Sequence, residues 1–115
     1  MLGCDIVELY RIKAAYARFG QRFLDKILSE REQAVFHKRN KNGLNFLAGR
    51  FAAKESISKS LKTGMRGIGF SDIEVLPVRG GAPEVYVRGI KRPDIEVSIS
   101  HGKDYAIAVS VMRQS

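Results

Sequence analysis

Cysteine is nearly absent from this chain of 115 residues, in which Cys4 is the only one. A single thiol excludes a disulfide within the chain. The first residues also lack the basic segment followed by an apolar segment that indicates a secretory signal. Reduced cysteine without such a signal is typical of the cytoplasm. We therefore expect a cytoplasmic protein.

Long hydrophobic runs are absent as well. The longest nearly apolar stretch, residues 105–112, has about 8 residues, whereas a membrane helix needs about 20, so we expect no membrane partner. Repeats, low-complexity tracts and linkers rich in proline or serine are also missing. With 44% hydrophobic and 28% charged residues the composition is that of a globular protein. A chain of this length buries one core, which predicts a single domain over residues 1–115.

Acidic residues are scarce relative to basic ones. The chain has 20 Lys and Arg against 12 Asp and Glu, a net charge of +8, and residues 11–41 contribute +6 of it. A surface of one sign attracts nucleic acid, an anionic membrane, an acidic protein or a phosphorylated small molecule. A solvated helix face explains one basic cluster equally well, so charge alone does not identify a partner.

The first half of the chain has mainly helical patterns. Gly20 suits the position after a helix, and Ser29 with Glu32 forms a capping-box pattern at the start of another, which should run to about Lys38. A stripe of apolar residues from Phe46 onward marks the clearest helix. The expected elements are a strand over residues 2–8, helices over 9–19 and 30–38, a polar turn over 40–45, and a helix over 46–61.

The second half has mainly strand patterns. Glycines at positions 64, 67 and 69 predict a loop. Segments rich in Val, Ile and Tyr then predict strands over residues 73–78, 84–88, 95–101 and 105–112. Residues 80–81 and 102–104 are typical of hairpin turns. Helices first and strands later indicate an α+β fold, with the N-terminal strand and the helices packed on a mainly antiparallel sheet.

Two acidic residues are candidates for binding a metal ion. Asp5 lies in an otherwise apolar strand, where an unpaired carboxylate is costly to bury, so it should lie at an edge, be paired, or bind a metal. Glu55 lies within the helix over residues 46–61, on the same face as Lys59 four residues later. On its own that pair indicates a surface salt bridge. Together with Asp5, Glu55 would suit Mg²⁺, which favours carboxylates and phosphate oxygens.

Three further side chains are of types that can carry chemistry. His101 ends a strand beside a tight turn, where it would either be a turn residue or donate to a phosphate. We interpret Cys4 as a core residue, since its neighbours are apolar, and His37 as a surface residue. Two histidines and one cysteine are too few for a zinc site, and no phosphate-binding loop pattern is present.

Four blocks of the sequence resemble one known family. Residues 3–12 are similar to the G-x-D-I-x-x-x-x-R-I opening of bacterial holo-[acyl-carrier-protein] synthases, of the 4′-phosphopantetheinyl transferase family. Residues 46–59 resemble their R-F-A-x-K-E-x-x-x-K motif, and residues 70–75 and 97–101 resemble two later blocks. The resemblance covers the whole chain in order, and it implies the fold of that family.

The resemblance also implies an activity. Such enzymes use Mg²⁺ to transfer the 4′-phosphopantetheine group from coenzyme A to a serine of apo-acyl carrier protein in fatty acid biosynthesis. The other product is adenosine 3′,5′-bisphosphate. Coenzyme A and an acidic carrier protein are then the partners, and a homotrimer with active sites between subunits is implied. A chain of 115 residues has little concavity with which to enclose a nucleotide alone, which agrees with such a site.

Particular residues acquire roles from the resemblance. Asp5 and Glu55 would hold Mg²⁺ and act with Lys59 in catalysis. The base that takes the serine proton would be Glu55 through a metal-bound water or a water linked to Asp5. The residues implied in coenzyme A binding are Arg50, Lys54, Lys59 and His101. Arg11 matches the carrier-docking helix, and charge and helical facing add Arg18 and Arg22.

Two residues depart from the family pattern, and two other functions are possible for this sequence. Ala82 stands where many relatives carry a basic residue, and Gly102 stands where many carry Ser or Thr. Each departure loses a possible contact with coenzyme A. A small basic nucleic-acid-binding module is an alternative, although no nucleic-acid motif is present. A relative that binds carrier protein without catalysis is another.

Overall fold

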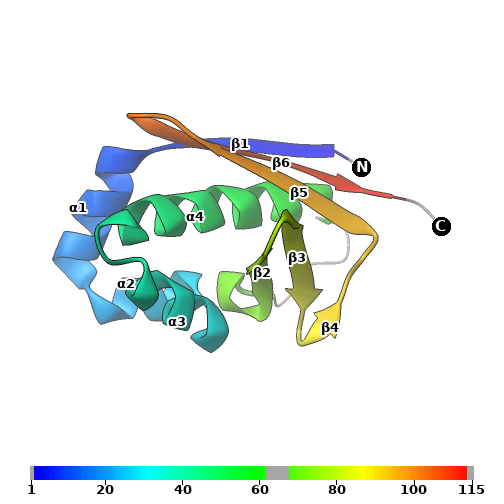
Figure 1. The fold of residues 1–115 in the computed structure, drawn as a ribbon, viewed down its shortest axis with the longest axis horizontal. Coiled ribbons are helices and arrows are strands. Elements are labelled where there is room, and N and C mark those ends of the chain that lie inside the picture. The colour runs from blue at the N-terminus through cyan, green and yellow to red at the C-terminus, as the bar shows by residue number, and fades with distance from the viewer. Residues whose placement is uncertain (1, 62–67, 114–115) are drawn as a thin grey trace.

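The structure is a computed structural model that describes residues 2–61 and 68–113, and Figure 1 shows its arrangement. The predicted loop at Gly64 and Gly67 lies outside the described residues. The elements are β1 (Leu2–Glu8), α1 (Leu9–Phe19), α2 (Gln21–Ile27), α3 (Glu30–Lys38), η1 (Asn40–Asn42), α4 (Gly43–Ser60), η2 (Phe70–Asp72), β2 (Ile73–Val78), β3 (Gly81–Val87), β4 (Ile90–Lys91), β5 (Ile95–His101) and β6 (Tyr105–Met112). The predicted α+β class is confirmed.

Helix α4 is the centre of the molecule. The strands form two three-stranded sheets, β1–β6–β5 and β2–β3–β4, in which all neighbours are antiparallel. In Figure 1 the β1–β6–β5 sheet lies along one side of α4, and α2, α3 and the β2–β3–β4 sheet lie on the other side. The expectation of one sheet is therefore corrected to two. No helix in the described part of the chain is long and apolar enough to cross a membrane.

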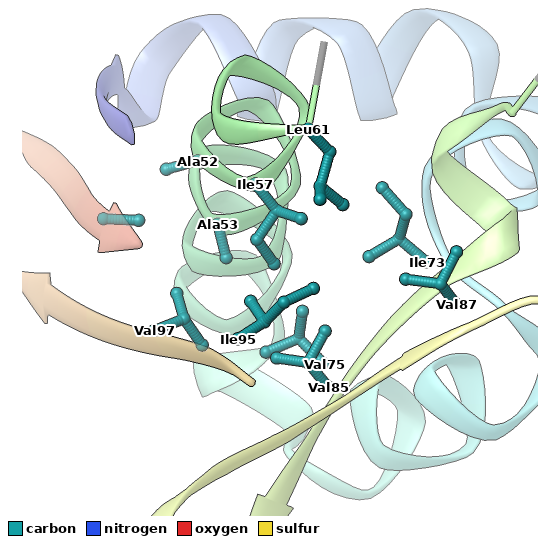
Figure 2. Close-up of a cluster of buried hydrophobic side chains, with 11 residues drawn as sticks. Ala52, Ala53, Ile57, Leu61, Ile73, Val75, Val85, Val87, Ile95 and Val97 are labelled. Carbon is teal, nitrogen blue, oxygen red and sulfur yellow. The ribbon is translucent and has the colours of Figure 1, made fainter. Parts of the chain in front are cut away.

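The main hydrophobic core lies between α4 and the two sheets. Figure 2 shows Ala53 and Ile57 of α4 pointing toward Val75, Val85 and Ile95 of three strands. A second cluster, which includes Ile12, Leu24, Phe36 and Phe46, joins α1, α2 and α3 to the first half of α4. Burial of each large apolar side chain contributes roughly 1.5–3 kcal/mol. The two clusters therefore fix α4 between the sheets and the first three helices.

Most of the predicted boundaries are confirmed. The strands over residues 2–8, 73–78, 95–101 and 105–112 and the helix over 9–19 have the predicted limits. The capping box of α3 forms, because the Ser29 hydroxyl accepts a bond from the Glu32 amide at 3.2 Å and Glu32 Oε1 accepts one from the Ser29 amide at 2.9 Å. These short-range signals needed no knowledge of the rest of the fold.

Helix α4 and strands β3 and β4 differ from the expectation. Helix α4 begins at Gly43 instead of residue 46, because residue 43 packs directly on α3, where an added Cβ would lie 3.1 Å from the Phe36 ring. Strand β3 begins at Gly81, which pairs with Val78, so Gly80, with φ of 74°, lies in the turn and Gly81 lies in the strand. The two-residue strand β4 was not predicted.

Cys4 is the clearest error of the sequence interpretation. Its side chain is exposed. Successive residues of a strand point to opposite faces, and in β1 Gly3 is buried whereas Leu2, Cys4 and Ile6 are exposed. The outer face of the β1–β6–β5 sheet is therefore apolar and uncovered in the single chain, a feature that alternation in a mostly apolar segment does not reveal.

Candidate functional site

The first cleft lies between β1, α1 and α4 and has a volume of about 640 Å³. Asp5 and Glu55, the two carboxylates predicted to bind a metal, both line it. Glu8 and Arg11 are on its wall and form a 3.8 Å ion pair, and Phe51 supplies part of its apolar surface. Residues far apart in the sequence thus contribute carboxylates to one concave surface.

Asp5 lies on an edge strand and is also paired, as its position in an apolar strand required. Its side chain is 19% exposed, and Oδ1 accepts a 3.2 Å bond from Lys59 Nζ. Lys59 also donates to the Cys4 carbonyl oxygen at 3.1 Å. This lysine therefore bridges α4 to β1 while 54% of its side chain is exposed, which leaves its ammonium accessible to an anion.

Glu55 differs from Asp5 in having no partner among the residues that the structure describes. It is half-buried, and no hydrogen-bond donor or cation of residues 2–61 and 68–113 contacts its carboxylate. No cluster of three or more His, Cys, Asp or Glu side chains that could hold a metal ion occurs in that same part of the chain. Two carboxylates are nevertheless sufficient for Mg²⁺, which keeps several waters and takes further oxygens from substrate phosphates.

Lys54 has a different environment from the one expected for a coenzyme A ligand. It is fully buried, and its ammonium donates to Glu32 Oε1 at 2.5 Å, to the Ile27 carbonyl at 2.7 Å and to the Phe70 carbonyl at 3.0 Å. Burial lowers the pKa of Lys54, and the Glu32 carboxylate opposes that shift. The structure does not support a phosphate-binding role for this lysine, because its ammonium is buried and its three N–H donors are already used within the protein.

Arg50 and His101 both line a second cleft, which has a volume of about 750 Å³ and lies between β5 and the β2–β3 hairpin. Arg50 Nε donates to the Val75 carbonyl at 2.8 Å, and its guanidinium lies 4.3 Å from the centre of the Phe46 ring. Burial lowers the pKa of Arg50 to about 10, so it remains a cation at neutral pH. Arg39, which was not singled out in the sequence, also lines this cleft.

His101 is held against α4 by a close contact. Its Nε2 donates to the Asn45 carbonyl at 2.8 Å, and an added Cβ on Gly49 would lie 2.6 Å from that nitrogen. Ala82 also lines the second cleft, where it supplies no charge. The departure at Ala82 therefore removes a cation from a cleft that still holds two arginines.

The two clefts are separate in the single chain. They share no lining residue, and they lie at opposite edges of one sheet, the first beside β1 and the second beside β5. The carboxylates of the first cleft and the cations of the second, which the sequence interpretation placed in one active site, are thus not brought together by the fold alone.

The basic residues expected to bind a carrier protein lie on the surface of α1 and α2. Arg11, Arg18 and Arg22 are all exposed, and the Arg18 guanidinium lies 5.1 Å from the centre of the Phe19 ring. An apolar groove of about 380 Å³ runs between α1, α2 and α4, with Phe23 and Phe51 in its wall and Arg22 and Lys26 at its rim. Phe23 and Phe51 also line the first cleft, so the groove and that cleft are neighbours with a common wall.

Sequence reasoning missed several of these residues for one reason. Glu8, Arg39 and Phe51 reach the clefts because helices and strands meet there, and nothing in their local pattern distinguishes them from ordinary surface or core residues. The one available signal was for Glu8, which lies three residues before Arg11 and can pair with it across one helical turn.

Comparison with known proteins gives consistent matches along the whole chain. A family model described as the 4′-phosphopantetheinyl transferase superfamily matches residues 1–110. A holo-[acyl-carrier-protein] synthase of Oceanobacillus iheyensis is 42% identical over 112 residues, which cover 96% of this chain and 93% of the relative. These matches rest on sequence alone, and they name the same family as the four sequence blocks.

Solved structures extend the comparison to the fold. The crystal structure of a holo-(acyl-carrier-protein) synthase from Bacillus anthracis in complex with CoA (3′,5′-ADP) has a TM-score of 0.84 at 36% identity and covers 99% of this chain and 96% of its own. The Helicobacter pylori holo-[acyl-carrier-protein] synthase in complex with coenzyme A has a TM-score of 0.80 at 32% identity, covering 96% and 98%. The alternative of a nucleic-acid-binding module is not supported.

Proposed function

The chain belongs to the 4′-phosphopantetheinyl transferase superfamily, and on that basis we propose that it is a holo-[acyl-carrier-protein] synthase. It transfers the 4′-phosphopantetheine group of coenzyme A to a serine of apo-acyl carrier protein and releases adenosine 3′,5′-bisphosphate. The observation that carries the proposal is the first cleft, where Asp5 and Glu55 line one surface and Lys59 bonds to Asp5. In vivo this reaction would serve fatty acid biosynthesis in the cytoplasm.

Asp5 and Glu55 are the residues that would hold Mg²⁺. The donor set fits this hard cation, because it consists of two carboxylates, of which Glu55 has no competing partner in the described part of the chain. When bound, Mg²⁺ supplies positive charge to the pyrophosphate oxygens of coenzyme A. Lys59 adds a second positive charge beside Asp5 and would bind a phosphate oxygen as a compact donor.

The serine nucleophile comes from the carrier protein, so this chain needs no nucleophile of its own. Its residues must hold the β-phosphorus in line with that serine and neutralise the charge that develops on the phosphate oxygens. They must also accept the serine proton. The carboxylates of Asp5 and Glu55, each acting through a water molecule, are the two candidates for this base.

We assign the nucleotide end of coenzyme A to the second cleft. Arg39, Arg50 and His101 supply cationic and donor groups there, and the wall beside them is formed by apolar residues such as Pro83. Guanidinium groups bind phosphate in a bidentate geometry, and Arg50 keeps its charge at neutral pH because its pKa is about 10.

A complete active site then requires a second copy of the chain. The carboxylates and the nucleotide cations lie at opposite edges of the β1–β6–β5 sheet, so a head-to-tail contact between copies would join the first cleft of one to the second cleft of its neighbour. The outer face of that sheet has the character of an interface, with five exposed apolar side chains at Leu2, Ile6, Ile107, Val109 and Val111. A closed ring of three copies, a homotrimer, is the proposed assembly.

The assembly can be tested with one charged side chain. Ile107 lies opposite Ile6 in the ladder, and Ile107→Glu would place an unpaired charge in the interface at a cost of several kcal/mol. We expect light scattering to report a trimer for the natural chain and a monomer for this variant, with loss of transfer activity. The matched control is Ile90→Glu, at an exposed apolar residue of β4 away from this face, which should remain trimeric. A natural chain that is monomeric at micromolar concentration would contradict the proposal.

The basic surface of α1 and α2 is the proposed docking site for the acidic carrier. Arg18→Glu and Arg22→Glu should each raise the KM for carrier protein about tenfold or more, because like charges then face each other, and should leave the KM for coenzyme A unchanged. Steady-state kinetics at two ionic strengths provide the measurement. Lys38→Glu at the end of α3 makes the same change in net charge and serves as the control. A KM for carrier protein that stays natural in Arg18→Glu and Arg22→Glu would contradict the docking site.

Product release tests the proposed reaction itself. Adenosine 3′,5′-bisphosphate should appear in chromatography when the chain, coenzyme A, apo-carrier protein and Mg²⁺ are all present, and omission of any of them should prevent it. Release without carrier protein would indicate hydrolysis of coenzyme A, and release that persists with a chelator would contradict the metal role of Asp5 and Glu55.

A further inference from the structure

Strand β1 and helix α4 are closest at Gly3. A Cβ added to Gly3 would lie 2.0 Å from the Ser56 carbonyl oxygen and 3.0 Å from Ser110 Oγ. The φ of Gly3 is not positive, so it is the space, and not the backbone conformation, that requires glycine here. The two backbones are therefore in direct contact, and any side chain at this position would separate them.

Buried hydroxyl groups surround this contact. Ser56, Ser60 and Ser110 are at most 2% exposed, and the Ser56 hydroxyl donates to Ser110 Oγ at 2.7 Å. Ser56 Oγ also lies 3.3 Å from the Gly3 carbonyl oxygen, and the Ser60 and Ser110 hydroxyls are 3.5 Å apart. A buried hydroxyl without a partner is costly, so these bonds favour one placement of α4 on the sheet, whereas an apolar contact tolerates sliding.

The same contact lies close to both candidate metal ligands and to Lys59. Asp5 follows Gly3 by two positions and shares its face of β1, Glu55 directly precedes Ser56, and Lys59 follows one turn later. Lys59 donates to Asp5 Oδ1 at 3.2 Å across the same gap. A shift of β1 relative to α4 at Gly3 would therefore be transmitted to the distance between the Asp5 and Glu55 carboxylates.

We propose that the contact of Gly3 with Ser56, fixed by the Ser56–Ser110 hydrogen bond, sets the spacing of the Asp5 and Glu55 carboxylates for a divalent cation. Gly3, Ser56 and Ser110 are then positioning residues that touch neither substrate nor metal. The inference deepens the proposed function and rests on it. Its physical basis is that Mg²⁺ demands a near-ideal octahedron, so a displacement of a fraction of an ångström weakens binding.

The test uses Mn²⁺ as a paramagnetic probe with the full-length chain and coenzyme A. Binding is measured by electron paramagnetic resonance for the natural chain and for Gly3→Ala, Ser56→Ala and Ser56→Ala/Ser110→Ala. We expect Gly3→Ala to weaken Mn²⁺ binding about 10- to 100-fold, the range found for residues that orient metal ligands, and the serine variants to weaken it less. Circular dichroism and urea unfolding of each variant show whether it is folded.

Gly69→Ala is the matched control, because an added Cβ there meets nothing nearer than 4.0 Å. It should bind Mn²⁺ as the natural chain does. If Gly3→Ala does not fold, Mn²⁺ binding by Ser56→Ala/Ser110→Ala tests the inference, since that variant removes atoms and adds none. Natural affinity in a folded Gly3→Ala or in the double variant would overturn the inference, whereas a natural chain that binds no Mn²⁺ with coenzyme A would overturn the proposed metal site itself.

Discussion

Lys54→Met is expected to lower the free energy of unfolding by about 3–5 kcal/mol, because it removes one partner of a buried ion pair. The change leaves the Glu32 carboxylate fully buried without its cation. Two backbone amides, those of Ser29 and Val75, still donate to Glu32 at 2.9 and 2.7 Å, but they do not neutralise its charge. Urea denaturation of the variant beside the natural chain gives the measurement.

The double variant Lys54→Met/Glu32→Gln separates the ion pair from other causes. Glutamine at position 32 keeps one oxygen for the Val75 amide, which now donates to Oε2. Its NH₂ group takes the place of Oε1, which loses the bond from the Ser29 amide but allows donation to the carbonyls of Ile27 or Phe70 that Lys54 now serves. Removing both charges is often neutral, so most of the lost stability should return. No recovery would show that the ion pair is not the source of the loss.

The same double variant tests the role that the sequence motif suggested for Lys54. The buried ammonium contacts no cleft, so the folded variant should keep the natural KM for coenzyme A, whereas Lys59→Met should raise it. A folded double variant with a greatly raised KM for coenzyme A would show that Lys54 does bind a phosphate, as the sequence interpretation held.

Glu55→Gln is expected to reduce the transfer rate by a factor of about 100 to 1000, the loss typical of one group that stabilises charge in a transition state. Stability should change by less than about 0.5 kcal/mol, because the Glu55 carboxylate has no protein partner in the described residues. Rates are measured at saturating Mg²⁺, and unfolding is followed in urea.

Glu8→Gln is the matched control for this prediction. Glu8 lines the same cleft, but it is paired with Arg11 and is not one of the assigned metal ligands, so its variant should remain active. A natural rate for Glu55→Gln at saturating Mg²⁺ would mean that neither the metal role nor the base role of Glu55 is correct.

Local signals in the sequence were sufficient for most of the fold. The alternation of β5 and β6 and the capping box at Ser29 depend on neighbours in the chain, and the structure agrees with them. Cys4 and Gly43 were misjudged because their environments are made by other elements. Strand alternation gives two faces but does not say which one α4 covers, and the start of α4 depends on a contact with Phe36.

The candidate site was predictable in part for the same reason. The resemblance implied a common site for Asp5 and Glu55, and both line the first cleft. The surface pair of Lys59 with Glu55 that helical spacing indicated does not form, because Lys59 bonds to Asp5 of β1 instead. The motif could not show that Lys54, beside Glu55 in sequence, points toward Glu32 of α3 and is fully buried there. Nor could it show that Arg50 and His101 open into a different cleft from Asp5, because that separation arises from the strand order of one sheet.

Intact-mass spectrometry of the carrier protein would detect the proposed transfer itself. Apo-acyl carrier protein is incubated with coenzyme A, Mg²⁺ and the chain, beside a carrier whose acceptor serine is alanine. The account predicts that the natural carrier gains the mass of one phosphopantetheine arm, that the alanine carrier gains nothing, and that a chelator prevents the gain. No gain on the natural carrier, or a gain that a chelator leaves unchanged, would contradict it.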